Sequence, residues 1–277
     1  MKVWDEHSSW QEAEAVWDLR AKEAKAKRPL RTLKVLPDIP GIVPKTAEHL
    51  KWKSFKYMLF HPEGKKILRY ILRHPFRYGR RYLGALGKKS SFTRDEDFFL
   101  YGLKSVEEFV KLAEDSLIVV GFSYCQKPHE CPSGRFTADC IHDAGDPVCQ
   151  QCDIGKVWHA LPGNAFVLWI PTIHYIGEEI LKLREKYPKR RLLFLITACE
   201  LTLTMFGDWG HMAGIEGIGV RLDGRICNTM EAFELSERGI KPGLTVVTEP
   251  TQKRILELIQ RLRSDACGGK ACCLAPK

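Results

Sequence analysis

The chain of 277 residues is 44% hydrophobic and 28% charged, a composition typical of a globular protein rather than a disordered or fibrous one. Its longest apolar runs, such as 192–198, are far shorter than the ~20 residues that a membrane-spanning helix needs. The N-terminal residues show no apolar stretch behind a basic tip, so we expect a cytoplasmic protein without a secretory signal.

Ten cysteines are the main anomaly of the composition. A chain of this length can bury a sufficient core without disulfides, and a reducing compartment disfavours them. Cysteines at this density in such a compartment more often bind metal or take part in redox chemistry. Composition alone therefore favours a metal-binding or redox protein.

The net charge of +9 is concentrated in one segment. Residues 51–89 hold 12 lysines and arginines against Glu63 alone, which gives +11, whereas residues 1–50 sum to +1 and residues 90–277 to −3. Three interpretations are open: an amphipathic surface for an anionic membrane, a site for nucleic acid phosphates, or a helical layer whose long cations reach water. No nucleic-acid-binding motif accompanies the charge. As a ligand of this segment, the inner surface of the membrane or an acidic partner protein is therefore favoured over nucleic acid.

The first part of the chain, residues 1–114, is predicted to be a basic α-helical region. Helix is expected over 1–35, followed by a Pro-rich extended link over 37–44, helical fragments to about Leu86, and a polar turn over 87–91. The apolar pattern from Asp95 to Glu114 predicts one or two further helices.

After residue 115 the pattern changes to short apolar runs separated by amphipathic stretches. Strands are predicted at 117–122, 165–170, 192–196, 218–222 and, as a fifth, 244–247, with helices at 173–186, 200–206, 230–238 and 251–263. Alternation of strands and helices predicts a Rossmann-like α/β domain over 115–265, with a mostly parallel sheet and flanking helices. Residues 266–277 are predicted to be a flexible Cys-rich tail.

Ligand sites of open parallel sheets form at the carboxyl ends of the strands. Cys125 follows the first predicted strand, Cys199 follows the third, and Cys227 lies a short loop beyond the fourth. These three thiols are therefore expected at one edge of the sheet.

A dense cysteine loop follows the first strand, and its five cysteines lie within 28 residues: Cys125, Cys131, Cys140, Cys149 and Cys152. The C-x-x-C pair at 149–152 brings two thiolates to one face, and a proline after Cys131 is common in cluster-binding sequences. Cys125, Cys131, Cys149 and Cys152 are the first-choice ligands, with Cys140 as substitute and His129 as a further ligand or hydrogen-bond donor. Zinc is the alternative, but the lack of a second C-x-x-C favours one or two [4Fe–4S] clusters.

Cys199 and Glu200 start a predicted helix, where the helix dipole lowers the pKa of a thiol. Cys199 is a candidate ligand, nucleophile or substrate-facing thiol, and Glu200 is either a proton carrier or a first-turn acid. Cys227 is a similar candidate, with Asn228 expected to cap the next helix. Cys199, Glu200 and Cys227 are thus the candidate catalytic residues, and Cys199 and Cys227 are also candidate metal ligands.

The tail carries three more cysteines, Cys267, Cys272 and Cys273, beside two glycines. These thiols could carry sulfur, electrons or a soft metal to the core site, supply ligands to a second cluster, or have no role. The chain has no G-x-G-x-x-G, no Walker A sequence and no C-x-x-x-C-x-x-C signature, so nucleotide binding and radical S-adenosylmethionine chemistry have no support. Of the other histidines, His142, His159, His174 and His211 lack metal-ligand spacing, and most of them are expected to be structural.

Several motifs together resemble the domain-of-unknown-function 116 family of prokaryotic proteins. They are Cys125-Gln126, Cys131-Pro132, Cys149-x-x-Cys152, Thr197-Ala198-Cys199-Glu200-Leu201, Gly219-Val220-Arg221-Leu222 and Cys227-Asn228-Thr229. The likeness covers about 120–240, and it departs at Tyr124, where a histidine is expected, and at the C-x-x-C, which lacks its usual glycine. It implies a cysteine-rich, cluster-binding cytosolic protein and no particular reaction.

The resulting hypothesis is a cytoplasmic iron–sulfur protein that transfers electrons to a redox partner, catalyses a redox reaction or transfers sulfur through thiols. An iron without a protein thiolate would leave a position open for substrate. The alternative is a zinc-stabilised adaptor whose segment 51–89 docks on a membrane, a nucleic acid or an acidic partner.

Overall fold

The computed structural model describes residues 1–31, 41–86, 92–241 and 243–268, and side chains up to residue 263. Its centre is a six-stranded sheet with the strand order β1-β2-β6-β5-β3-β4. Four strands are parallel: β3 (Ser116–Ser123), β4 (Phe166–Ile170), β5 (Arg191–Ala198) and β6 (Glu216–Arg221). The antiparallel strands β2 (Phe98–Tyr101) and β1 (Thr93–Asp95) extend the β6 edge. The expected α/β class with a mostly parallel sheet is confirmed.

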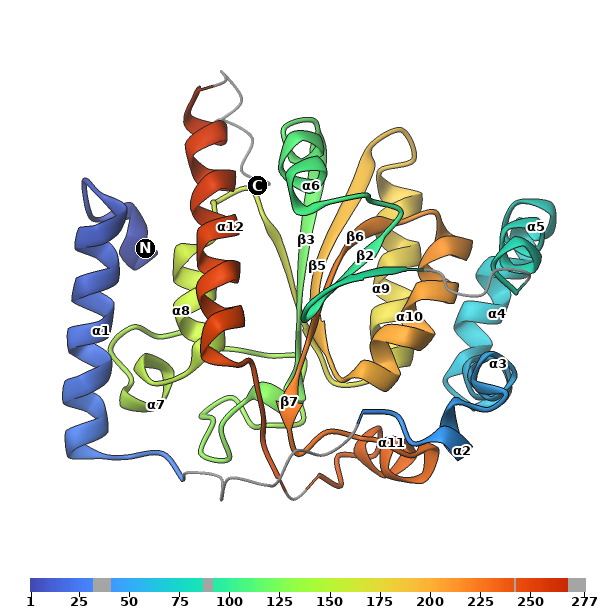
Figure 1. Cartoon of the computed structure of the whole chain (residues 1–277), viewed down its shortest axis with the longest axis horizontal. Coiled ribbons are helices and arrows are strands. Elements are labelled where there is room, and N and C mark those ends of the chain that lie inside the picture. The colour runs from blue at the N-terminus through green and yellow to red at the C-terminus, as the bar shows by residue number, and fades with distance from the viewer. Residues whose placement is uncertain (32–40, 87–91, 242, 269–277) are drawn as a thin grey trace.

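Helices cover both faces of the sheet (Figure 1). One face is covered by α9 (Ile173–Lys186) and α10 (Glu200–Ala213), with α3 (Leu50–Phe60), α4 (Gly64–Arg73) and α5 (Pro75–Leu86) outside them. The other face is covered by α6 (Val106–Ala113), α8 (Asp153–Ala160) and α12 (Glu249–Gly268), with α1 (Trp10–Lys27) outermost. The remaining elements are short: η1 (Val3–Asp5), α2 (Pro44–Ala47), η2 (Tyr124–Gln126), α7 (Pro147–Gln150), β7 (Asp223–Gly224), α11 (Met230–Ser236) and β8 (Thr245–Val246).

The central strand β5 shows why its sequence is apolar without interruption. Successive side chains of a strand point to opposite faces of the sheet. Phe194 and Ile196 pack in the core under α9 and α10, whereas Leu193 and Leu195 pack in the core under α6, α8 and α12. Both faces are covered, so every position from Leu192 to Ala198 is buried.

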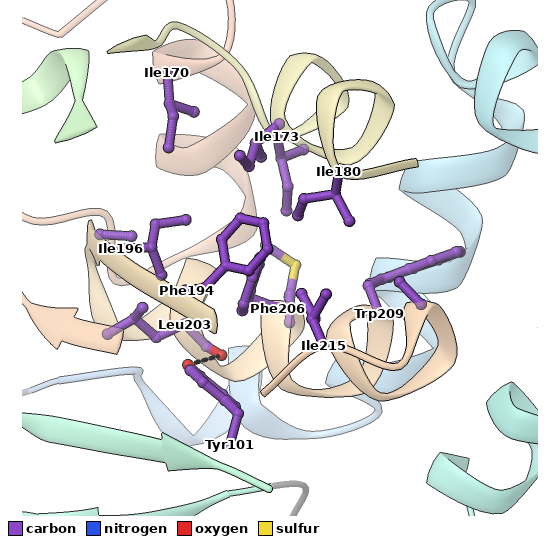
Figure 2. Close-up of a cluster of buried hydrophobic side chains, with 14 of the residues drawn as sticks. Tyr101, Ile170, Ile173, Ile180, Phe194, Ile196, Leu203, Phe206, Trp209 and Ile215 are labelled. Carbon is purple, nitrogen blue, oxygen red and sulfur yellow. Dashed lines mark hydrogen bonds between the residues drawn. The ribbon is translucent and has the colours of Figure 1, made fainter. Parts of the chain in front are cut away.

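Aromatic rings fill the core beneath α9 and α10 (Figure 2). The ring of Phe206 contacts those of Phe194 and Tyr101, with centroids 6.1 and 5.4 Å apart. The buried hydroxyl of Tyr101 donates a hydrogen bond to the carbonyl oxygen of Leu203 at 2.8 Å. This contact fixes the antiparallel strand β2 to α10 and pairs the buried hydroxyl of Tyr101.

Most predicted elements of the α/β region are confirmed, and the helix predicted at 173–186 has the observed bounds of α9. The helical prediction for 95–114 is correct for α6 but wrong for 98–101. All four residues of β2 are buried and pair with β6, so the sheet pairing overrides the helical pattern. The fifth predicted strand is the short β8, which pairs with β7 in a separate two-stranded sheet. Residues 37–40 of the predicted link and the whole predicted turn 87–91 lie outside the described residues.

Within the parts of the chain that the structure describes, no helix combines the length and the apolar composition needed to cross a membrane.

A substitution at Gly217, at the start of β6, tests how closely the backbones of β6 and β5 approach each other. A Cβ atom at Gly217 would lie 2.1 Å from the carbonyl oxygen of Phe194 in β5. We expect Gly217→Ala to lower the free energy of unfolding by about 2–4 kcal/mol, because two backbones must separate. Gly79→Ala is the matched control: no atom lies within 4 Å of its Cβ position, and alanine favours helix α5, so stability should stay equal or rise by up to ~1 kcal/mol. Urea denaturation measures both variants, and equal stabilities would contradict this account of the sheet.

Candidate functional site

Three cysteines meet at the carboxyl edge of the sheet, as their places after the strands predicted. Cys125 lies in η2 directly after β3, Cys199 follows β5, and Cys227 lies between β7 and α11. All three are buried and line one pocket of about 530 Å³, a volume that includes the space open to solvent. The free space between its walls is about 40 Å³, enough for a few water molecules, and we call it the thiol pocket.

Cys199 occupies the residue before α10, where its thiol meets the positive end of the helix dipole. Its Sγ lies 3.2 Å from the hydroxyl oxygen of Thr202, and the thiol of Cys227, which donates to the carbonyl oxygen of Ala232 at 3.5 Å, is close enough to influence its pKa. A thiolate at Cys199 can therefore accept a hydrogen bond from the Thr202 hydroxyl in place of water.

Lys241 supplies the positive charge of the thiol pocket. Its side chain is buried, and its Nζ donates a hydrogen bond to the Sγ of Cys227 at 3.2 Å. Burial alone would lower the pKa of this lysine, but the charges of the three thiols around it raise the pKa above its usual value. Lys241 thus keeps its proton although it is out of water.

The titrations of Cys199 and Cys227 depend on each other because the two thiols lie close together beside Lys241. The thiol of Cys227 is the largest influence on Cys199 and, with the charge of Lys241, holds the pKa of Cys199 well below that of an ordinary thiol. The pKa of Cys227 is raised, since it would have to lose its proton beside a thiolate. Cys199 is therefore the thiol of the pair that loses its proton more readily, and Cys227 is the one that keeps it.

Two further side chains complete the wall of the thiol pocket. Burial, with the nearby charge of Cys199, raises the pKa of Glu237 to about 8, so its carboxyl group holds a proton at neutral pH. One oxygen of Glu237 accepts a hydrogen bond from the amide of Ile173 at 2.7 Å. The hydroxyl of Tyr124 donates to the carbonyl oxygen of Ser236 at 2.5 Å, which ties η2 to α11.

The other four cysteines of the loop form a second group around the buried side chain of Lys127. The Nζ of Lys127 donates to the carbonyl oxygens of Gly134, Thr137 and Asp139 at 3.3, 3.0 and 2.5 Å, which closes the loop around it. The thiols within electrostatic reach of one another or of Lys127 are those of Cys131, Cys140, Cys149 and Cys152. We call these four residues the loop cysteines.

Arg135 joins the loop cysteines to the thiol pocket. Its guanidinium group donates to the carbonyl oxygens of Cys125, Lys127 and Lys241 at 3.2, 3.2 and 2.6 Å, and to that of Gly243. A guanidinium group can make several such bonds at once because its five N–H donors are held in one plane. The positions of Cys125 and Lys241 therefore depend on the same side chain that closes the cysteine loop.

The four cysteines predicted as first-choice cluster ligands do not all lie in one group. Cys125 lies in the thiol pocket, within electrostatic reach of Cys199 and Lys241, whereas Cys140 is near Cys131 and Cys149. Among the described residues, these loop cysteines do not form a group of three ligand atoms all within 4.8 Å of one another. Their thiols are thus neighbours that are spread more widely than four sulfurs on one ion.

Glu200 does not line the thiol pocket. Its carboxylate instead forms ion pairs with Arg94 at 3.4 Å and Arg221 at 3.5 Å, which link the start of α10 to β1 and β6. This geometry favours a structural role, one of the two readings left open for this residue. Thr229, rather than the expected Asn228, caps α11: its hydroxyl oxygen accepts from the amide of Ala232 at 3.1 Å.

The remaining predicted site residues lie outside these groups or outside the described structure. His129 is near Glu130, Arg135 and Arg31, and no contact with a cysteine is found for it within the described part of the loop. Helix α12 continues to Gly268, so Cys267 belongs to its last turn, and Cys272 and Cys273 lie outside the described residues.

Sequence reasoning missed the charged residues of both cysteine groups: Lys127, Arg135, Glu237 and Lys241. No motif or spacing separates them from the other charged residues of the chain, because what distinguishes them is burial, which depends on the fold. A comparison with protein-family models, curated proteins and solved structures finds no match for the chain. The resemblance to the domain-of-unknown-function 116 family therefore stays a prediction.

The pH dependence of thiol alkylation tests the charge arrangement of the thiol pocket. We expect iodoacetamide to modify the Cys199–Cys227 pair at a rate that stays high below pH 7, because one of the two thiols is already ionised there. Lys241→Met keeps the buried stem but removes the charge, so the midpoint should move up by about one pH unit or more, and the rate at pH 6.5 should fall ~10-fold. Lys182→Met, on the exposed side of α9, is the control. Mass spectrometry of the labelled peptides gives the rate at each thiol. Identical pH profiles for wild type and Lys241→Met would refute this role of the lysine.

Proposed function

We propose that the chain is a thiol-dependent redox protein whose reactive group is the Cys199 thiolate, and that its loop cysteines bind an iron–sulfur cluster. The observation that carries the proposal is that Cys199 and Cys227 line one pocket at the carboxyl edge of a parallel sheet, with the Lys241 ammonium group hydrogen-bonded to Cys227. Free thiols at the seven described cysteines other than Cys267 agree with a reducing compartment such as the cytoplasm.

A thiolate with a second thiol in contact is suited to thiol–disulfide exchange. The Cys199 thiolate forms a bond to one sulfur of a substrate disulfide, and the other sulfur leaves with the electron pair as a thiolate. Cys227, once it has lost its proton, attacks the Cys199 sulfur, closes a Cys199–Cys227 disulfide and releases the second thiolate. The substrate gains two electrons, the cysteine pair loses two, and an external dithiol reduces the pair for the next cycle.

The buried polar groups of the thiol pocket support each part of this exchange. Lys241 stabilises the attacking thiolate, and the protonated carboxyl of Glu237 can give its proton to the leaving thiolate. The pocket is small, so we propose a low-molecular-weight disulfide or persulfide as substrate. A persulfide would make the same first step a sulfur transfer.

The loop cysteines fit a cluster better than a single zinc ion. Zinc holds each sulfur at about 2.3 Å in a tetrahedron, which places the sulfurs closer together than the loop cysteines are found. A four-iron cluster is larger and takes its thiolate ligands at wider separation, and Cys131, Cys140, Cys149 and Cys152 supply the four that it needs. The buried ammonium group of Lys127 would offset part of its negative charge. When bound, such a cluster supplies one-electron transfer.

Metal analysis of matched serine variants tests the ligand set. Protein purified without oxygen should contain about four iron and four sulfide per chain, and Cys140→Ser should lose most of this cluster. Cys125→Ser is the matched control, since Cys125 belongs to the thiol pocket, and it should keep the iron content of the wild type. A colourless protein with about one zinc per chain would indicate a structural zinc site instead of a cluster. Loss of iron in Cys125→Ser but not in Cys140→Ser would instead support the first-choice set of the sequence.

The basic helices α3–α5 favour a second function, docking on an anionic membrane surface. Five large apolar side chains on these helices are exposed: Trp52, Phe60, Leu72, Phe76 and Leu83. They alternate with cations along the same helix faces; on α5, Phe76 and Leu83 flank Arg80 at helical spacing. Exposed apolar side chains beside lysines and arginines suit the boundary between headgroups and acyl chains better than they suit nucleic acid phosphates.

Vesicle binding tests this docking surface. The protein should bind phosphatidylcholine vesicles containing phosphatidylserine in co-sedimentation and should bind pure phosphatidylcholine weakly. The double variant Phe76→Ser/Leu83→Ser should bind at least ~10-fold more weakly, because two buried apolar side chains contribute roughly 1.5–3 kcal/mol each. Leu19→Ser is the control, since Leu19 is exposed on α1, at the opposite side of the molecule (Figure 1). Equal binding of the double variant, or tighter binding to single-stranded RNA than to vesicles, would argue against the membrane.

A further inference from the structure

Two histidines and a glutamate meet at the end of α3, in a place that neither cysteine group uses. His61 is the residue after α3, Glu63 is the residue before α4, and His174 lies on the first turn of α9, after β4. One ligand atom from each of the three lies within 4.8 Å of the other two, and this is the only such group of three among the described residues. The sequence hides it, because His174 is 111 positions away from Glu63.

His174 carries the clearest sign of a missing ligand. Its side chain is 3% exposed, and its Nε2 atom is buried without a hydrogen-bond partner of good geometry, although the backbone of Tyr57 and Met58 lies close to the ring. Buried polar atoms are nearly always paired, so such an orphan nitrogen calls for an explanation. The other ring nitrogen, Nδ1, lies 3.9 Å from a carboxylate oxygen of Glu63.

The other two groups can move to complete a coordination sphere. The Glu63 carboxylate is 58% exposed, and Nδ1 of His61 accepts only a long hydrogen bond of 3.4 Å from the amide of Glu63. The rings of His61 and His174 are stacked with centroids 4.7 Å apart, and the ring of Tyr57 contacts both at 5.1 Å. Metal ligands at 2.0–2.2 Å lie within about 4.4 Å of one another, so the three atoms are close to this range, and the two stacked rings would also have to turn so that their in-plane lone pairs meet at one ion.

We infer that His61, Glu63 and His174 bind a divalent transition-metal ion. Two imidazoles and one carboxylate are the ligand set that ions from Mn²⁺ to Zn²⁺ take in proteins, and they leave coordination positions open on the exposed side of Glu63. Soft ions that require thiolates are disfavoured here, so this site and the loop cysteines select different metals.

The metal site adjoins the thiol pocket through Glu237. The Glu237 carboxyl group accepts a hydrogen bond from Ile173, the residue before His174, and it lies within electrostatic reach of both Glu63 and Cys199. The same side chain lines the thiol pocket. A cation on the two histidines would thus act on the same glutamate that lines the thiol pocket.

Binding of Mn²⁺ tests the site. It is measured as the loss of the electron paramagnetic resonance signal of the free ion. Mn²⁺ is a suitable probe because it prefers oxygen and imidazole ligands over thiolates. The full-length protein should bind one Mn²⁺ per chain, and Zn²⁺ should displace it, as the order of divalent affinities requires. His61→Ala and Glu63→Gln should each weaken Mn²⁺ binding at least ~10-fold. Both positions are at least partly exposed, so these variants should fold, and circular dichroism checks this.

Two controls separate this inference from the proposed function. His49→Ala removes an exposed histidine of the same helical region and should leave Mn²⁺ binding unchanged. Cys140→Ser should lose the cluster and keep Mn²⁺ binding, so failure at one site does not depend on failure at the other. Absence of saturable Mn²⁺ binding, or equal affinity in wild type, His61→Ala and Glu63→Gln, would overturn the inference.

Discussion

The Lys241 ammonium group is buried among three thiols, and a charge removed from water in this way is stable only if an opposite charge lies beside it. The thiol of Cys199, whose pKa lies below that of Cys227, provides that charge when it loses its proton. The dependence is mutual: without the lysine, the thiolate would lose its partner, and without the thiolate, the lysine would have to give up its proton. The reactivity that we propose for Cys199 is a consequence of this pairing.

The position of Lys241 depends in turn on a second buried cation. Arg135 comes from the cysteine loop, and it holds the backbone on both sides of the thiol pocket through the carbonyl oxygens of Cys125 and Lys241. Lys127 closes the loop from which Arg135 projects. A cluster or metal on the loop cysteines would act on the same backbone, so occupancy of the loop and geometry of the thiol pocket are expected to be coupled through Arg135.

The functional groups gather at one edge because the sheet is parallel there. The strands β3, β4 and β5 all end at this edge, and each is followed by a loop or helix N-terminus that carries a reactive side chain: Cys125, His174 and Cys199. Cys227 and Lys241 reach the same edge from the segments on either side of α11. The amphipathic layer α3–α5 adds His61 and Glu63 from outside. This layer therefore contributes to the proposed metal site and also carries the exposed apolar surface.

The sequence by itself determined the α/β class, the positions of four parallel strands and the meeting of Cys125, Cys199 and Cys227, because buried parallel strands require continuous apolar runs and the residues after them share an edge. Only the tertiary structure decided that 98–101 is a strand, since pairing with β6 overrides a local pattern that also fits a helix. It also decided which cysteines are neighbours, which lysine is buried with them, and that His174 meets His61. Those relations arise between residues far apart in the chain, and no local pattern encodes the distance between two side chains that only the packed fold brings together.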